Sequence, residues 1–150
     1  MMEWPEFNEH GNLPSGIHPA TLKDVLAQFG RSSLARAIIA RRLERIYRLA
    51  AGTGSVARFI VFGSFVTAKE EPNDVDVFML MEDNFDVDGL TGEARIVFEP
   101  LKAQNYEGAS VFWLRRSAVF GGEQSAIETW QRTRERTMRG IVEIVSDDSE

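Results

Sequence analysis

The stretch RFIVFGSFVTAKEEPNDVDVFMLM, residues 58–81, decides the fold that we expect for this chain. It starts with a short run of branched and aromatic side chains, residues 58–62, which is typical of a β-strand and is cut by Gly63 and Ser64. A second run, residues 75–81, is apolar on both faces after its first positions, as in a strand inside a sheet. The two runs therefore predict neighbouring strands of one sheet.

Helices are expected before this stretch, and mixed elements after it. Pro19 suits the first turn of a helix, where its missing N–H costs nothing, and Gly30 can end that helix. The serine pair 32–33 can cap a second helix that reaches about Ala51. The later pattern predicts a helix interrupted by Pro100, a strand, a helix and a last strand, at residues 93–103, 109–114, 123–136 and 140–145. Three aromatic residues of these elements are expected in the core or at an interface: Phe112, Trp113 and Trp130.

The order of the expected helices and strands predicts one α+β domain, a mixed sheet with flanking helices, over residues 19–145. An irregular arm over residues 1–18 precedes it, and a loose acidic tail over residues 146–150 follows. A chain of 150 residues with 43% hydrophobic and 27% charged residues is long and apolar enough to fold as a single domain. It has no cysteine, which excludes disulfides, thiolate metal sites and cysteine nucleophiles. The acidic N-terminus and the lack of a long apolar run favour a cytoplasmic protein that does not span a membrane.

Basic residues gather on the second expected helix. Its apolar stripe consists of Ala35, Ile39, Leu43, Ile46 and Ala50. Arg41, Arg45 and Arg48 lie on roughly the opposite side. They form either an ordinary solvated surface or a contact surface for an acidic partner or RNA, because guanidinium groups bind carboxylates and phosphates well. The net charge of −6 argues against a protein that coats nucleic acid in general.

Two aspartates at the start of the second strand carry the chemistry. Asp74 and Asp76 are two residues apart, so their carboxylates share one face of the strand about 7 Å apart. Such a pair stays ionised most readily around a cation, and Mg²⁺ (or Mn²⁺) suits oxygen ligands that phosphates complete. Upstream, Gly63 allows a phosphate to approach the backbone, and Ser64 adds a hydroxyl and an N–H. A Gly-Ser turn alone is common in ordinary turns, and an aspartate pair alone is common at strand ends. Together, the two features favour phosphoryl or nucleotidyl transfer.

Gly63-Ser64 followed by Asp74-x-Asp76 resembles the motif of the polymerase-β-type nucleotidyltransferase superfamily, especially its small stand-alone prokaryotic members. The arm at residues 7–18 and the segment at residues 139–142 are similar to a bacterial group of nucleotidyltransferase-like proteins. The resemblance implies the nucleotidyltransferase fold, a Gly-Ser loop that holds a nucleoside triphosphate, and an aspartate pair that coordinates two Mg²⁺ ions. It also makes a toxin plausible as a partner, since small members often act as antitoxins that modify a ribonuclease toxin.

The chain departs from that superfamily at one position. A third carboxylate normally stands on the next strand, where this sequence has Ser110, a weak metal ligand that is no base at neutral pH. Glu107 and Glu99 are the nearest alternatives, and each would need a shifted strand or an unusual approach. The leading function is therefore Mg²⁺-dependent binding of a nucleoside triphosphate, with transfer of its nucleoside monophosphate to a protein or RNA hydroxyl. The alternative is a catalytically impaired binding or regulatory module, such as an antitoxin-like partner of a toxin.

Overall fold

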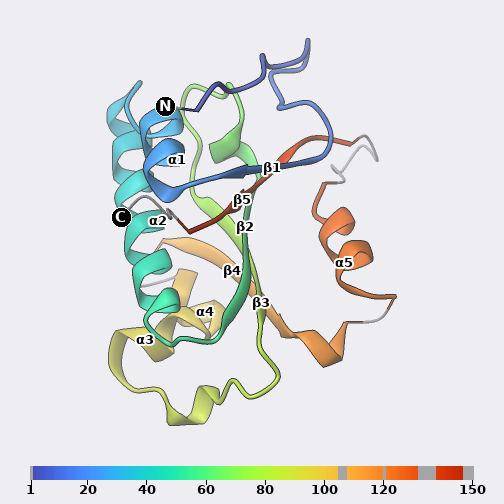
Figure 1. The fold of residues 1–150 in the computed structure, drawn as a ribbon. Helices are drawn as coiled ribbons and strands as arrows, with labels where there is room; N and C mark the ends of the chain where they lie inside the picture. The colour runs from blue at the N-terminus through green and yellow to red at the C-terminus, as the bar shows by residue number, and fades with distance from the viewer. Residues whose placement is uncertain (1, 105–107, 120, 132–137, 147–150) are drawn as a thin grey trace.

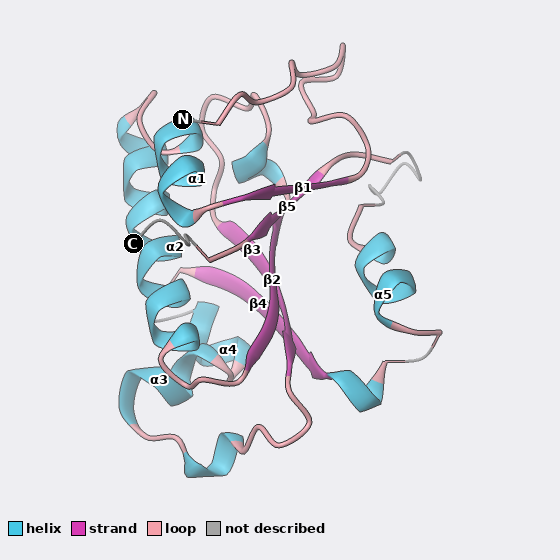
Figure 2. Cartoon of the chain, in the orientation of Figure 1, coloured by secondary structure: helices cyan, strands magenta, loops and turns pink. Residues whose placement is uncertain are grey.

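A mixed sheet of five strands forms the centre of the molecule (Figure 1 and Figure 2). The computed structural model describes residues 2–104, 108–119, 121–131 and 138–146. The strands lie in the order β1-β5-β2-β3-β4. Their bounds are β1 Ile17–Ala20, β2 Val56–Phe62, β3 Val75–Met81, β4 Ala109–Arg115 and β5 Ile141–Ile144. The pairs β1–β5 and β3–β4 are parallel, whereas β2 is antiparallel to both β3 and β5.

Helices cover both faces of the sheet (Figure 1). Four lie on one face: α1 Leu22–Phe29, α2 Leu34–Ala51, α3 Gly92–Val97 and α4 Pro100–Lys102. On the other face lies α5, Glu123–Thr129. The expected α+β class, mixed sheet and flanking helices are therefore confirmed. No helix in the described ranges is long and apolar enough to cross a membrane.

The helix ends follow local side-chain chemistry. Ser33 caps α2 by accepting a hydrogen bond from the backbone N–H of Arg36 over 3.1 Å, and Gly30 ends α1, both as predicted. The break at Pro100 separates α3 from α4, also as predicted. The prediction for Pro19 was wrong, because this residue lies in β1 and α1 begins only after Thr21. An edge strand tolerates proline, and β1 pairs with β5 alone.

The sheet separates two apolar clusters. The larger one lies between the sheet and α1–α4, and the smaller one lies on the side of α5. The smaller cluster consists of Ile60, Phe78, Leu80, Ile127 and Ile141. Since Val75 and Val77 belong to the larger cluster and side chains alternate along a strand, Asp76 shares the α5 face with Phe78. Of the helix expected at residues 123–136, the part from 132 onward lies outside the described residues, as do residues 147–150 of the expected tail.

One buried arginine interrupts the apolar stripe of α2. Ile39, Leu43, Ile46 and Ala50 are buried as expected, but Ala35 is only partly buried and Arg36 is 4% exposed. The Arg36 guanidinium donates hydrogen bonds to four backbone carbonyl oxygens, those of Phe29, Phe65, Thr67 and Lys69. Burial lowers the pKa of Arg36 from its ordinary value. The side chain thereby fastens the connection between β2 and β3 to α2.

Candidate metal and phosphate site

Three neighbouring strands place the predicted site residues at one edge of the sheet. Asp76 of β3 is the register partner of Phe62 in β2 and of Ser110 in β4. Gly63 follows Phe62 directly, and Asp74 stands just before β3. The structure thus brings together two strand starts and one strand end, with both aspartates and Ser110 among them.

Gly63 allows the backbone to lie against the Asp76 carboxylate. Its φ of 80° and ψ of −166° are readily adopted only by glycine. A Cβ at this position would overlap Oδ2 of Asp76 and lie 2.9 Å from its Cγ. The turn that follows, Ser64–Val66, is a single 3₁₀ turn rather than the start of a longer helix. Glycine at position 63 is therefore a structural condition for the carboxylate to occupy this place.

Ser110, the residue that the sequence analysis placed at the expected position of a third carboxylate, lies beside Asp74. Its hydroxyl donates to Oδ2 of Asp74 over 3.1 Å, and its Oγ is 3.0 Å from Oε1 of Gln104. A serine hydroxyl carries one proton, so it can serve only one acceptor at a time. The arrangement gathers oxygen atoms from carboxylate, hydroxyl and amide groups, which are the ligands that Mg²⁺ and Mn²⁺ prefer.

The two aspartates are electrostatically strained in the absence of a cation. Burial, together with the charge of Asp74, raises the pKa of Asp76 from 3.8 to about 6. Hydrogen bonding from Ser110 and the positive charge of Arg139 oppose this rise in pKa only in part. A divalent cation between the carboxylates would favour their ionised forms, so the residues present fit such an ion. The described residues contain no group of three or more acidic, histidine or cysteine side chains arranged to hold a metal.

The raised pKa of Asp76 predicts that metal-free protein loses stability as the pH rises. The folded state keeps the proton up to about pH 6, whereas the unfolded chain releases it near 3.8. The free energy of unfolding should therefore fall by roughly 2 kcal/mol between these two pH values, after allowance for solvent screening. Above the higher pH value it should level off. Urea unfolding in EDTA at about pH 4.5 and about pH 7.5 measures the fall. Asp76→Asn should show a smaller fall, and an equal fall in both proteins would contradict the assignment.

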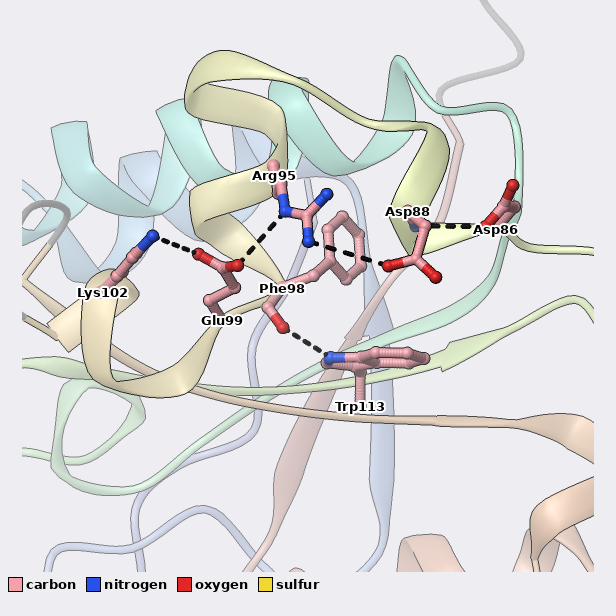
Figure 3. A network of polar contacts seen from close by, with 7 residues as sticks. All are labelled: Asp86, Asp88, Arg95, Phe98, Glu99, Lys102 and Trp113. Atoms are coloured by element: carbon pink, nitrogen blue, oxygen red, sulfur yellow. Dashed lines mark hydrogen bonds and ion pairs between the residues drawn. The ribbon is translucent and has the colours of Figure 1, made fainter.

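Glu99 takes part in a network of charged side chains around α3 and α4 (Figure 3). Its carboxylate contacts Nζ of Lys102 at 3.1 Å and Nε of Arg95 at 3.2 Å, and hydrogen bonds from Lys102 and then Arg95 lower its pKa. Arg95 also lies 3.7 Å from Asp88, which extends the network along α3. Glu107, the other alternative for the third carboxylate, lies outside the described residues.

Arg139 is a site residue that sequence reasoning missed. Its positive charge acts on Asp76, and its Nε is buried without a hydrogen-bond partner in the structure. A buried N–H of this kind is costly unless an acceptor joins it, and a phosphate oxygen would serve. The sequence shows only an arginine just before the last strand, and no local pattern places it near a strand in the middle of the chain.

The three arginines of α2 lie on the surface, but on the other side of the sheet from Asp76. Arg41, Arg45 and Arg48 are all exposed. Arg45 pairs with Glu93 of α3, and Arg48 contacts Glu44 one turn earlier at 3.1 Å. Pairs that are this exposed contribute little to stability. The solvated position of the three side chains is thus confirmed, whereas a partner for them stays a prediction.

Fold and site together define a small α+β protein with an acidic, oxygen-rich site at the edge of a mixed sheet. The chain belongs to DUF6932, a family of unknown function, and the match covers residues 5–145. Searches of curated proteins and of solved structures found no match.

Proposed function

We propose that this protein binds a nucleoside triphosphate together with Mg²⁺ at Asp74 and Asp76, and that its sheet is a form of the nucleotidyltransferase fold. One observation carries the proposal: two carboxylates and a bare glycine backbone meet where β2 ends and β3 and β4 begin, and burial and mutual repulsion raise the pKa of Asp76 to about 6. The resemblance of the Gly63-Ser64 and Asp74-x-Asp76 motif to the superfamily points the same way.

Each residue has a distinct part in this proposal. Asp74 and Asp76 hold the metal, which supplies charge neutralisation and polarisation of the phosphates when it is bound. Gly63 and Ser64 offer an approach to the backbone without a side chain in the way, followed by a hydroxyl. Arg139 offers its buried, unpartnered Nε–H to a phosphate oxygen. Metal and phosphate would thus be held by residues that follow β2, by residues at the start of β3 and by the segment before β5.

Transfer of a nucleoside monophosphate to a protein or RNA hydroxyl is the weaker part of the proposal. The position opposite Asp76 holds Ser110, whose neutral hydroxyl cannot take a proton from an attacking hydroxyl at pH 7. This observation favours a second function, that of a binding or regulatory module such as an antitoxin-like partner of a toxin. The exposed arginines of α2 would then be a contact surface for an acidic partner.

The proposal predicts nucleotide binding that depends on metal and on both aspartates. Titration calorimetry with a non-hydrolysable triphosphate should show binding with Mg²⁺ or Mn²⁺ and none in EDTA. The double variant Asp74→Asn, Asp76→Asn should bind at least about 100-fold more weakly, because the carboxylates are the metal ligands. Its stability at neutral pH should not fall, since the change removes a repulsion.

The chain supplies a matched control for this experiment. Asp86-Val87-Asp88 has the same three residue types, but its aspartates are exposed and stand around a 3₁₀ turn. The variant Asp86→Asn, Asp88→Asn removes the same charge and should bind like the parent protein. Equal weakening by both double variants, or full binding by the Asp74/Asp76 variant, would contradict the proposal.

A further inference from the structure

An aromatic cluster lies beside the candidate metal site, on the same face of the sheet. The rings of Phe62 and Trp130 are 4.7 Å apart between centroids, and those of Phe112 and Trp130 are 5.1 Å apart. Phe62 and Phe112 are 6.3 Å apart, which closes the triangle. These separations are within the range of favourable ring contacts. We call these three side chains the aromatic ledge.

Strand register fixes the place of the aromatic ledge relative to the aspartates. Phe62 is the register partner of Asp76. Phe112 stands two residues after Ser110 on β4, so it shares that face of the sheet and lies about 7 Å farther along the strand. That separation is comparable to the span from the phosphates to the base of a nucleotide. The ledge therefore begins at the carboxylates and extends away from them.

Phe112 is far more exposed than packing alone requires. Its ring is 43% exposed, whereas Phe78, its register partner on β3, is 1% exposed. Trp130 and Phe62 are partly buried and pack against the smaller apolar cluster, and both rings contact that of Phe112. An aromatic side chain that is partly open to solvent and held by two other rings is suited to stacking with a planar ligand.

We propose that Phe112, supported by Trp130 and Phe62, stacks with the base of the nucleoside triphosphate whose phosphates lie at Asp74 and Asp76. This inference rests on the proposed function and adds a base-binding contact to it. Every base has a π-face, so a stacking contact accepts all of them. Stacking grows with ring area, so the ledge should favour purines over pyrimidines modestly.

The test separates the base from the phosphates. Titration calorimetry in Mg²⁺ compares a non-hydrolysable ATP analogue with inorganic tripolyphosphate, which has no base. Phe112→Ala should weaken binding of the analogue about tenfold, as expected for loss of one stacking contact. The affinity for tripolyphosphate should not change. Phe112→Leu keeps apolar volume against Trp130 and should show the same selective loss, whereas Phe112→Tyr should bind like the parent. Leu114→Ala is the matched control, because Leu114 is 42% exposed on the same strand and face but farther from Asp76.

Each outcome decides between the two proposals. If Phe112→Ala and Phe112→Leu bind the analogue like the parent, the aromatic ledge is not a base site, and the proposed function stands. If both variants weaken tripolyphosphate binding as much as analogue binding, the ring supports the site only through packing, and the inference is wrong. If the parent protein binds neither compound, the proposed function fails and the inference falls with it.

Discussion

Replacing Arg36 by methionine is expected to lower the free energy of unfolding by about 4 kcal/mol, measured by urea denaturation followed by circular dichroism. The side chain is 4% exposed and donates to four backbone carbonyl oxygens, at distances of 2.5 to 3.2 Å. Methionine fills a similar volume but donates nothing, so buried carbonyls lose their partners. In the parent protein, Cζ of Arg36 also lies 5.6 Å from the centroid of the Phe65 ring, and the variant loses this cation–π contact.

A second arginine on the same helix provides the control. Arg41→Met removes the same charge from an exposed position and should change stability by less than about 0.5 kcal/mol. Arg36→Lys should be nearly as harmful as Arg36→Met, because an ammonium group cannot reach the separate carbonyls that the planar guanidinium serves. If Arg36→Met and Arg41→Met were equally stable, Arg36 would not fasten the β2–β3 connection.

Gly63→Ala is expected to destabilise the protein by about 3 kcal/mol and to abolish metal-dependent nucleotide binding. The φ of 80° with a ψ of −166° strains any residue with a Cβ. The added methyl group would also overlap the Asp76 carboxylate, which must move out of its place between β2 and β4. Stability is measured by urea denaturation, and binding by calorimetry with Mg²⁺ and a triphosphate analogue.

Gly54→Ala is the control that introduces backbone strain without a steric clash against a neighbouring side chain. Gly54 has a φ of 73°, but a Cβ there would meet nothing within 4 Å. This variant should therefore cost only about 1 kcal/mol and bind nucleotide like the parent protein. If Gly63→Ala were no worse than Gly54→Ala in stability and binding, the contact between Gly63 and Asp76 would have no functional weight.

Much of the fold could be predicted because local signals and tertiary packing agree. β3 has the expected bounds, since a short apolar run that follows turn residues favours a buried strand. α2 likewise begins after Ser33 and ends at Ala51, as expected. β1 was missed because Pro19 is equally at home in a first helical turn and in an edge strand, and only pairing with β5 decides between them. Arg36 was missed because an arginine at a core position becomes understandable only when the carbonyl oxygens around it are known.

The site residues that lie close together in the sequence could be predicted, but those that only the fold brings together could not. Gly63, Asp74 and Asp76 lie within one short stretch, so their order along the chain carried the interpretation. Asp-Val-Asp also occurs at residues 86–88, and only the strand context distinguishes the two copies. Phe112 and Trp130 were expected to be core or interface residues. Sequence spacing could not show that α5 ends beside β4 and leaves one ring exposed near Asp76.

The position of β5 has a consequence for synthesis on the ribosome. This strand follows every other described strand along the chain, yet it lies between β1 and β2 in the sheet. Until residues 141–144 have left the exit tunnel, β1 has no strand to pair with. Ile60 and Val61 of β2 likewise lack their partners in β5. Until β5 emerges, the growing chain thus carries an unpaired, apolar strand edge, and association with other chains is a hazard. β1 therefore joins the sheet only after β5 emerges, so a strand that precedes β2, β3 and β4 in the chain is fixed in place later than they are.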